Sequence, residues 1–201
     1  MITNRHPRES GDPGKEQKLD PCFRGNDELE KPMTGENCRA EPMTEAHREA
    51  LRAACAEDPD IWQLWMLDFG PSGFDANFER TAELPWLRFM LYDGDELAGM
   101  SCFINPDERR GTVEIGGTYY RPKFRGTGFN RRCKAMMLKR AFDCGMRRVE
   151  FRVDNRNKRS QAAMKKLGAV REGVIRADRI TWTGHVRDTV LFAILKDEWP
   201  V

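Results

Sequence analysis

A glycine-rich turn between a strand-like and a helix-like segment constrains the fold of this chain more than any other feature. Residues 125–130 read Arg-Gly-Thr-Gly-Phe-Asn; a strand-like run, 112–120, precedes them and a basic helical run, 131–144, follows. Glycines after a strand allow successive backbone N–H groups to turn inward, and the following helix adds the positive end of its dipole. The junction therefore predicts a β–α turn that binds a phosphate or pyrophosphate through main-chain donors.

The spacing of the glycines and the charge around them narrow the class of ligand. The turn has no Gly-Lys-Ser/Thr ending, which excludes a P-loop, and Gly126-x-Gly128-x-x-Arg131 lacks the third glycine of a dinucleotide fingerprint. Sixteen Lys or Arg residues and only three acids occupy residues 121–166, although the whole chain has a net charge of +2. Such a run is either a solvated surface or counter-charge for a ligand with several phosphates, and its position around the turn favours the second.

The turn and four later blocks together resemble one known superfamily. Arg125-x-x-Gly128-x-Asn130 is similar to the Arg/Gln-x-x-Gly-x-Gly/Ala signature of the GCN5-related N-acetyltransferases, the GNAT superfamily, and departs from it at Asn130, which resembles a subgroup variant. The later blocks resemble the RimJ/RimL-type branch of that superfamily: Asp154–Ser160, Leu167–Ala169, Arg171–Val174 and Val186–Thr189. The resemblance extends from about Glu36 to Trp199.

The resemblance implies an α/β (α+β) fold of GNAT type. This fold has a mixed, mostly antiparallel central sheet of about six to seven strands, with helices on both faces and a β–α pyrophosphate-binding turn. The sequence pattern predicts helices at 44–57, 74–84, 129–144 and 157–167, with a further helical patch near 61–66. It predicts strands at 37–43, 86–92, 97–105, 112–120, 148–154, 170–182 and 188–195. The order strand, helix, strand across 112–154 requires a parallel crossover.

Composition indicates how the chain is organised and where it works. Residues 1–32 are polar and aperiodic, so we expect a disordered extension, with Met33 a hypothetical biological start, and one acetyltransferase domain over 33–201. The longest apolar stretches are too short to cross a bilayer, and the N-terminus has no apolar signal core, so we expect a cytoplasmic protein without membrane attachment. The cysteines and histidines are scattered, which predicts no metal site.

Transfer of an acetyl group to an amine requires a base, and Glu114 is the preferred candidate. An alkyl ammonium with a pKa near about 10 must lose a proton, which a carboxylate in a partly desolvated cleft can accept. The resemblance implies a base at about the position of Glu114, in the strand that leads into the turn. The alternative is a strand glutamate that faces solvent, and Glu172 and Asp178 are weaker candidates for the base.

The resemblance also implies the residues that bind coenzyme A. Backbone N–H groups near the end of the strand would polarise the thioester carbonyl, and Gly116-Gly117 indicates a bulge that could free such a donor. The expected coenzyme A-binding residues are Thr118, Tyr119, Tyr120, Arg125, Gly126, Thr127, Gly128, Phe129, Asn130, Asn157 and Ser160.

The leaving thiolate needs a proton donor, and here the chain departs from the superfamily. Many members use a tyrosine on the short helix, but Met164 occupies that position. We expect Ser160, or water held by Ser160 and Asn157, to replace it, because a thiolate of pKa about 8.5 needs only a weak donor. Both residues could instead simply cap the helix.

Several functional hypotheses follow. The leading one is an acetyl-CoA-dependent N-acetyltransferase, whose acceptor is a primary amine of a protein N-terminus or a small molecule. Alternatives are transfer of a larger acyl group shaped by Met100 and Phe103, a non-catalytic acyl-CoA sensor, and a basic nucleic-acid-binding module. The last is disfavoured because aromatic residues are not interleaved for base stacking. Trp62 and Trp65 could form walls of the acceptor pocket or belong to the core. Likewise, the C-terminal aromatic residues could contact a second copy in a homodimer or belong to the core: Trp182, Phe192 and Trp199.

Overall fold

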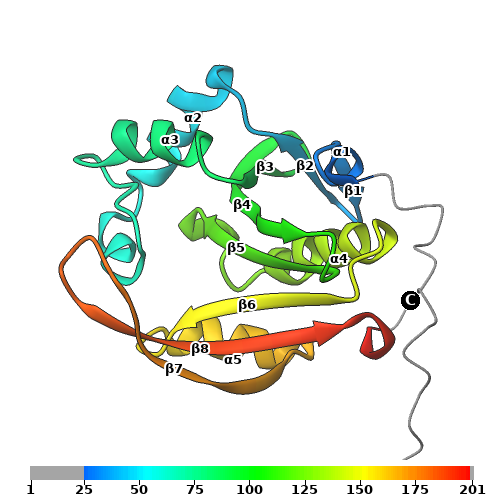
Figure 1. Ribbon diagram of the computed structural model, residues 1–201. Helices are drawn as coiled ribbons and strands as arrows, with labels where there is room; N and C mark the ends of the chain where they lie inside the picture. The colour runs from blue at the N-terminus through cyan, green and yellow to red at the C-terminus, as the bar shows by residue number, and fades with distance from the viewer. Residues whose placement is uncertain (1–24, 200–201) are drawn as a thin grey trace, which may run out of the picture.

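The computed structural model describes residues 25–199, which form one eight-stranded sheet in the order β1-β2-β3-β4-β5-β6-β8-β7 (Figure 1). All neighbouring strands are antiparallel except the parallel pair β5 and β6. The strands are β1 (Met33–Gly35), β2 (Cys38–Pro42), β3 (Trp86–Asp93), β4 (Glu96–Asp107), β5 (Thr112–Tyr120), β6 (Arg148–Asp154), β7 (Val170–Ile180) and β8 (Val186–Leu195). The predicted fold class and the parallel crossover are confirmed.

Helices cover both faces of this sheet. They are α1 (Gly25–Leu29), α2 (Arg48–Cys55), α3 (Phe74–Ala82), α4 (Phe129–Asp143) and α5 (Lys158–Leu167), with short 3-10 turns η1 (Glu45–His47), η2 (Pro59–Leu64), η3 (Pro122–Phe124) and η4 (Lys196–Glu198). Helix α4 packs against β1, β2, β5 and β6, and α5 against β6, whereas α2 and α3 pack against β4 and β3. Within residues 25–199, no helix is long and apolar enough to span a bilayer.

The N-terminal part of the fold differs from the sequence prediction. Strand β1 brings the number of strands to eight rather than six or seven, because it is a three-residue strand that the pattern does not reveal. Leu29 of α1 is fully buried in the core, and the Arg140 guanidinium donates to the carbonyl oxygens of Glu28, Lys31 and Pro32. The fold therefore begins before residue 33; the rest of the predicted extension, 1–24, lies outside the described residues.

A bulge in β5 reverses the faces of the sheet to which its residues point. Cys102 of β4 pairs with Gly116 and Met100 pairs with Tyr119, so two residues of β5 oppose one of β4, as the sequence predicts for this glycine pair. Gly117 adopts a φ of +54°, which glycine tolerates readily. Ile115 packs on the α4 side of the sheet, whereas Tyr119 packs in the core on the opposite side. Without the bulge these two odd-numbered residues would share a face.

The parallel pair holds together over only part of its length. The described pairing joins residues 112–114 of β5 to residues 148–150 of β6. Beyond Glu114 the two strands diverge, and the wedge between them lies next to the first turns of α4 and α5 (Figure 1). The glycine turn before α4 and the loop before α5 therefore end at the same opening in the sheet.

Candidate active site

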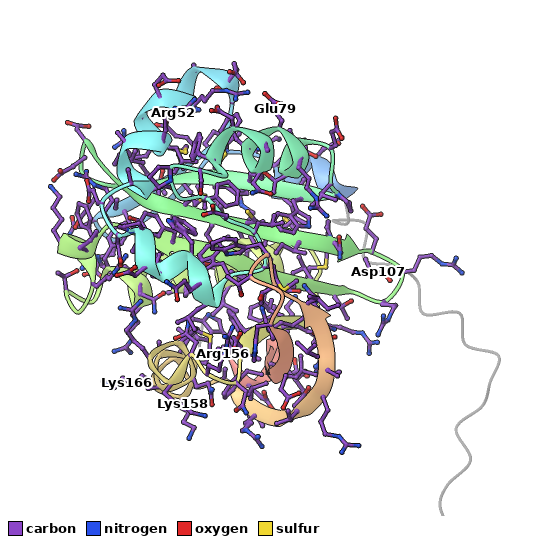
Figure 2. All side chains as sticks on the ribbon, turned by 90° about the vertical axis from the view of Figure 1, so that its left-hand side faces the viewer. Arg52, Glu79, Asp107, Arg156, Lys158 and Lys166 are labelled. Atoms are coloured by element: carbon purple, nitrogen blue, oxygen red, sulfur yellow. The ribbon has the colours of Figure 1, made fainter. Side chains whose placement is uncertain are left out.

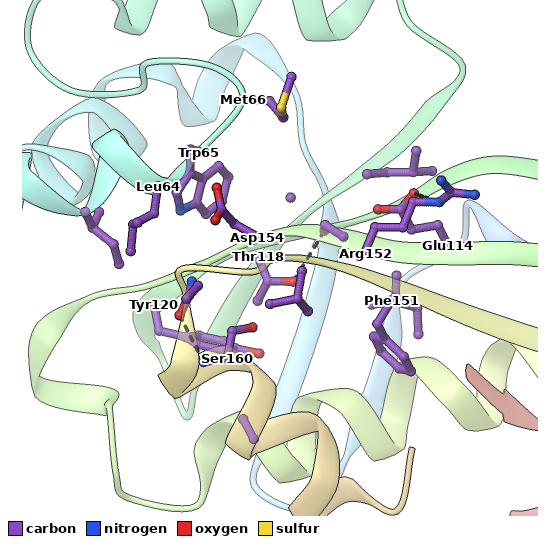
Figure 3. A pocket seen from close by; sticks show the side chains of 18 of the residues that line it. Leu64, Trp65, Met66, Glu114, Thr118, Tyr120, Phe151, Arg152, Asp154 and Ser160 are labelled. Carbon is purple, nitrogen blue, oxygen red and sulfur yellow. Dashed lines mark hydrogen bonds and ion pairs between the residues drawn. The ribbon is translucent and has the colours of Figure 1, made fainter. Parts of the chain in front are cut away.

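A pocket of about 470 Å³ lies where β5 and β6 diverge, and side chains from both faces of the sheet line it (Figure 3). Leu64, Trp65 and Met66 from the end of η2 and the loop after it line one side. Tyr120 and Ser160 lie on the other side, near the start of α5. The pocket thus passes through the sheet rather than resting on one face, and two ligands could meet within it.

The glycine turn has the open conformation that the sequence predicts. Gly126 and Gly128 have φ values of +81° and +85°, and Gly128 is the N-terminal cap of the fifteen-residue helix α4. A Cβ atom at Gly126 would meet no atom within 4 Å, and one at Gly128 would meet only the Arg132 side chain at 3.9 Å. No neighbouring side chain fills the concave turn, so an anion could approach the main chain at the positive end of the helix dipole.

Two side chains beside the turn leave polar atoms without partners. Arg125 donates from Nε to the Tyr120 carbonyl oxygen at 2.8 Å and pairs with Asp58, which fixes its guanidinium at the pocket. Its Nη2 atom and the Tyr120 hydroxyl are buried and have no hydrogen-bond partner within the described part of the chain, and the Tyr120 hydroxyl lies near Cys133 and Cys38 of the core. They are therefore unpaired interior atoms beside the pocket, an exception to the usual pairing of buried polar groups, and not donors that face the pocket.

The start of α5 contributes amide and hydroxyl groups. The Asn157 side chain accepts a hydrogen bond from the Ser160 backbone N–H at 3.0 Å, which confirms the predicted capping role of Asn157, and both residues line the pocket. Met164 also lines it and is only 4% exposed. Basic side chains lie along α5: Lys158 at its start and Lys166 in its last turn are labelled in Figure 2, and Arg156 in the preceding loop pairs with Asp154 at 2.8 Å.

Glu114 is the predicted base that the structure places in the pocket. Its side chain is 13% exposed, and its Oε2 lies 3.5 Å from Nε of Arg152, as Figure 3 shows. Burial raises the pKa of Glu114 above its ordinary value, and the charges of Arg179, Arg152 and Arg187 lower it in part. The carboxylate therefore faces the pocket, not bulk solvent.

The two weaker candidates for the base are held by other groups. Glu172 accepts from Nη1 and Nη2 of Arg148 at 2.7 and 2.5 Å, and these hydrogen bonds lower its pKa. Asp178 lies 3.3 Å from Nε of Arg179. Neither residue lines the pocket, in contrast to Glu114.

Sequence reasoning did not assign several charged residues of the pocket, and two of them are buried cations. Lys134 of α4 is 3% exposed, and Arg187 of β8 is 6% exposed. Arg187 donates from Nη2 to the Arg152 carbonyl oxygen at 3.0 Å, and burial lowers its pKa. Lys134 lies among the apolar inward positions of its helix, such as Cys133 and Met137, and that irregularity was the available signal.

The other residues predicted to bind coenzyme A lie partly in the pocket lining and partly outside it. The Tyr119 side chain is fully buried and donates to the Ala54 carbonyl oxygen at 2.6 Å, because the bulge turns it away from the pocket. Phe129 packs between Tyr120 and Phe124. Of the remaining residues predicted to bind coenzyme A, Thr118, Gly126 and Asn130 line the pocket. Thr127 and Gly128 lie in the turn, outside the pocket lining.

Of the residues predicted to line the acceptor or acyl pocket or to contact a second copy, some lie where predicted and others belong to the core. Trp65 lines the pocket, but Trp62 is fully buried and donates to the Cys55 carbonyl oxygen at 3.1 Å. Met100 and Phe103 are buried in the two opposite cores and are absent from the pocket lining. Phe192 is core, Trp199 packs against the same core, and Trp182 is 47% exposed.

A mixed sheet that opens at its one parallel pair, with a glycine turn ahead of the adjacent helix, is the architecture of an N-acetyltransferase. The family model described as the acetyltransferase (GNAT) domain matches residues 39–170, and the chain belongs to this family. None of the curated proteins matches the chain significantly.

Solved structures agree with this assignment. A protein from T. thermophilus, assigned to the acetyltransferases, is 34% identical over 84% of this chain and 91% of its own, with a TM-score of 0.76. A GCN5-related N-acetyltransferase from Brucella melitensis is 27% identical over 85% and 81% of the two chains, with a TM-score of 0.75. RimJ of Mycobacterium smegmatis, in complex with CoA-disulfide, is 19% identical over 85% and 88%, with a TM-score of 0.69, and shares the fold.

Proposed function

We propose that this enzyme transfers the acetyl group of acetyl-CoA to a primary amine, which attacks the thioester directly. The observation that carries the proposal is the continuous pocket through the sheet, which joins the glycine turn on one side to Glu114 on the other. Two proteins of the same fold support it: RimJ was solved with CoA-disulfide, and the microcin C7 self-immunity acetyltransferase MccE with acetyl-CoA and AMP.

The residues present fit coenzyme A. The unfilled turn at Gly126 and Gly128 suits a pyrophosphate, and the positive charge of Arg125 lies at the pocket beside it. Asn157 and Ser160 would hold the amides of the pantetheine arm. When bound, coenzyme A supplies an acyl group activated as a thioester, and main-chain N–H groups at the β5 bulge would orient its carbonyl.

Glu114 would act as the base for the incoming amine. An ammonium group of pKa about 10 must lose a proton before it attacks, and a buried carboxylate with a raised pKa is suited to accept one near neutral pH. Arg152, Arg179 and Arg187 around it favour the ionised form. Trp65 and its neighbours would pack on the apolar part of the acceptor, which is either a protein N-terminus or a small-molecule amine.

Calorimetric titration with acetyl-CoA tests the cofactor half of this proposal. We expect micromolar binding by the wild-type protein, lost in Gly128→Asp because a carboxylate would occupy the anion site. Gly184→Asp is the matched control, since Gly184 has a similar φ of +81° and open surroundings but lies in the turn between β7 and β8. Equal binding by all three proteins would contradict the assigned turn.

Turnover assays with peptides and small amines test the second half. Acetylation of an amine in the panel, lost in Glu114→Gln with binding intact, is the expected result. Tight acetyl-CoA binding without turnover on any amine would favour the acyl-CoA sensor instead. Absence of acetyl-CoA binding together with salt-dependent binding of RNA would favour the basic nucleic-acid module.

A homodimer through the C-terminal strands is part of the same proposal. Strand β7 lies at one edge of the described sheet, and Ile180, Trp182 and Val186 near it are 66%, 47% and 53% exposed. Apolar side chains on an edge strand favour pairing with a second copy. Light scattering that gives only a 23.2 kDa particle at micromolar concentration would contradict a dimer.

A further inference from the structure

We propose that Lys134 donates the proton that the sulfur atom takes up when the thioester bond breaks, the role left open because Met164 stands where many relatives have a tyrosine. This inference rests on the proposed acetyl transfer. The sequence candidate was the Ser160 hydroxyl, and the Lys134 variants below distinguish the two, because Ser160 is unchanged in them.

The position of the Lys134 ammonium group carries the argument. Lys134 extends from α4 to the β5 bulge, where its Nζ lies 2.6 Å from the Thr118 hydroxyl oxygen and 3.3 Å from that of Ser101. An ammonium group has three N–H donors and no acceptor, so two hydroxyls leave one donor unused. Because Lys134 lines the pocket and is only 3% exposed, the pocket is where that donor can act.

Few groups around Lys134 stabilise its protonated form. No carboxylate lies within ion-pair distance of Nζ among the described residues. The titratable groups that face it are Cys133 on α4, Cys102 on β4 and Glu114 on β5, and the Phe151 ring of β6 lies 5.9 Å away. A hydrogen bond with Cys38, together with burial, raises the pKa of the Cys133 thiol, and burial raises that of Cys102 to about 12, so neither is a thiolate near neutral pH.

Burial makes Lys134 an unusually good acid for a lysine. Its pKa falls from 10.5 to about 7, since the buried site disfavours the charged form. A departing thiolate has a pKa of about 8.5, so proton transfer from Lys134 to sulfur is favourable. A lysine of ordinary pKa would hold its proton more tightly than the thiol does.

Lys134 and Glu114 also lie on opposite sides of β5. Glu114 precedes the bulge and lies near the arginines of β6, β7 and β8, whereas Thr118 follows the bulge and points toward α4. During acetyl transfer the amine nitrogen on the acceptor side loses a proton, and the sulfur on the coenzyme A side takes one up. Glu114 and Lys134 therefore lie on the sides where a base and an acid are needed. Enzymes commonly assign acid and base roles to groups whose environments shift their pKa values in this way.

The proposed step balances in atoms and electrons. The amine nitrogen forms a bond to the carbonyl carbon, and the carbon–sulfur bond breaks with its electron pair on sulfur. The proton that the ammonium form of the acceptor loses before attack passes through Glu114 to solvent. During the attack Glu114 takes a second proton from the nitrogen, and Lys134 gives one proton to the sulfur. Transfer of a proton from Glu114 to Lys134 through water restores the starting state, so no other reactant is consumed.

Two variants separate acid catalysis from a structural role. Lys134→Met keeps a chain of similar length without a proton, and Lys134→Arg keeps the charge but is too weak an acid. We expect both to bind acetyl-CoA within about threefold of wild type and to lose about 10²-fold or more in kcat. The decline of kcat at high pH, where Lys134 loses its proton, should disappear in Lys134→Met.

An unchanged kcat in Lys134→Met, or a decline of kcat at high pH that persists in that variant, would overturn the inference while leaving the proposed acetyl transfer intact.

The wild-type protein provides a test that does not require any variant to fold. Labelling with acetic anhydride, followed by mass spectrometry, should modify Lys134 with a pH midpoint near neutrality, and saturating coenzyme A should protect it. A midpoint typical of exposed lysines would refute the acid role. Stable acetylation of Lys134 by acetyl-CoA alone would also refute it, because Lys134 would then act as a nucleophile.

Discussion

Replacing Lys134 by methionine should stabilise the ligand-free protein, and by more at low pH than at high pH. The pKa of Lys134 falls from 10.5 to about 7 on folding. At about 1.36 kcal/mol per unit, this shift corresponds to about 5 kcal/mol of unfavourable burial of the charge. Methionine fills similar space without a charge, and buried charges are often replaced by apolar groups at no net cost.

The sign follows from proton linkage. Between pH 7 and 10.5 the unfolded chain keeps the Lys134 proton and the folded protein loses it, so the free energy of unfolding rises with pH. The gain in the free energy of unfolding is complete above the pKa of Lys134 in the unfolded chain, 10.5, and is lost as the pH falls to its pKa in the folded protein, about 7. The two hydroxyls that Lys134 contacts, on Ser101 and Thr118, lie 2.7 Å apart and bond each other in its absence, so few polar atoms would be left unpaired.

Urea unfolding followed by circular dichroism measures the effect. We expect the stability advantage of Lys134→Met to shrink by several kcal/mol between about pH 6 and about pH 10, with an upper limit of about 5. Lys139→Met is the matched control on the same helix, because Lys139 is 70% exposed and pairs with Asp143 at the surface. A difference between Lys134→Met and wild type that does not vary with pH would refute the reasoning.

Three further substitutions have expected outcomes. Glu114→Gln should lower kcat/KM by about 10²–10⁴ and remove the loss of activity at low pH that comes from protonation of Glu114, whose pKa is raised; unchanged kinetics across pH would exclude it as the base. Gly99→Ala should lower the free energy of unfolding, measured with urea, by about 3 kcal/mol or more, because its Cβ would lie 2.0 Å from the Tyr119 carbonyl oxygen. The control Gly173→Ala, where a Cβ would meet open space, should lower it by less than about 0.5 kcal/mol, and similar losses in the two variants would contradict the packing. Tyr119→Phe should lower the free energy of unfolding by only about 1 kcal/mol, since the Ala54 carbonyl oxygen keeps a second donor, the Glu57 N–H. It should leave acetyl-CoA binding unchanged, and a tenfold weaker affinity would show that the Tyr119 side chain contributes to the site.

The elements around the site were predictable because their signals are local. Strands β5 and β6 have the predicted bounds, and α4 ends within one residue of its prediction, because strand-forming and helix-forming residues there are bounded by clear turn signals such as Gly145. The glycine turn also follows from neighbouring residues, since a positive φ at Gly126 and Gly128 needs no distant partner. Short β1 and the helix α1 before it have no such local signal and depend on packing against α4.

The division of β5 between the two sides of the site could not be read from its own residues. Gly116-Gly117 indicates a bulge, but only pairing with β4 fixes which residues oppose Ser101 and therefore which side chains reverse. That pairing turns Tyr119 into the core and Thr118 toward Lys134. A shift of one residue in register exchanges the two faces, so the strand pattern alone does not decide to which side the Thr118 and Tyr119 side chains point. The predicted role of residues 118–120, as backbone N–H donors to the thioester, stays a prediction.

The sequence by itself determined the family, the order of the elements and the glycine turn before α4, because these depend on residue types at fixed spacing along the chain. The tertiary structure alone decided the ionisation of the pocket. Glu114 and Lys134 are ordinary charged residues in the sequence, and their pKa values move toward neutrality only when distant segments bury them. Burial and charge proximity are properties of three-dimensional neighbours, which no local pattern specifies.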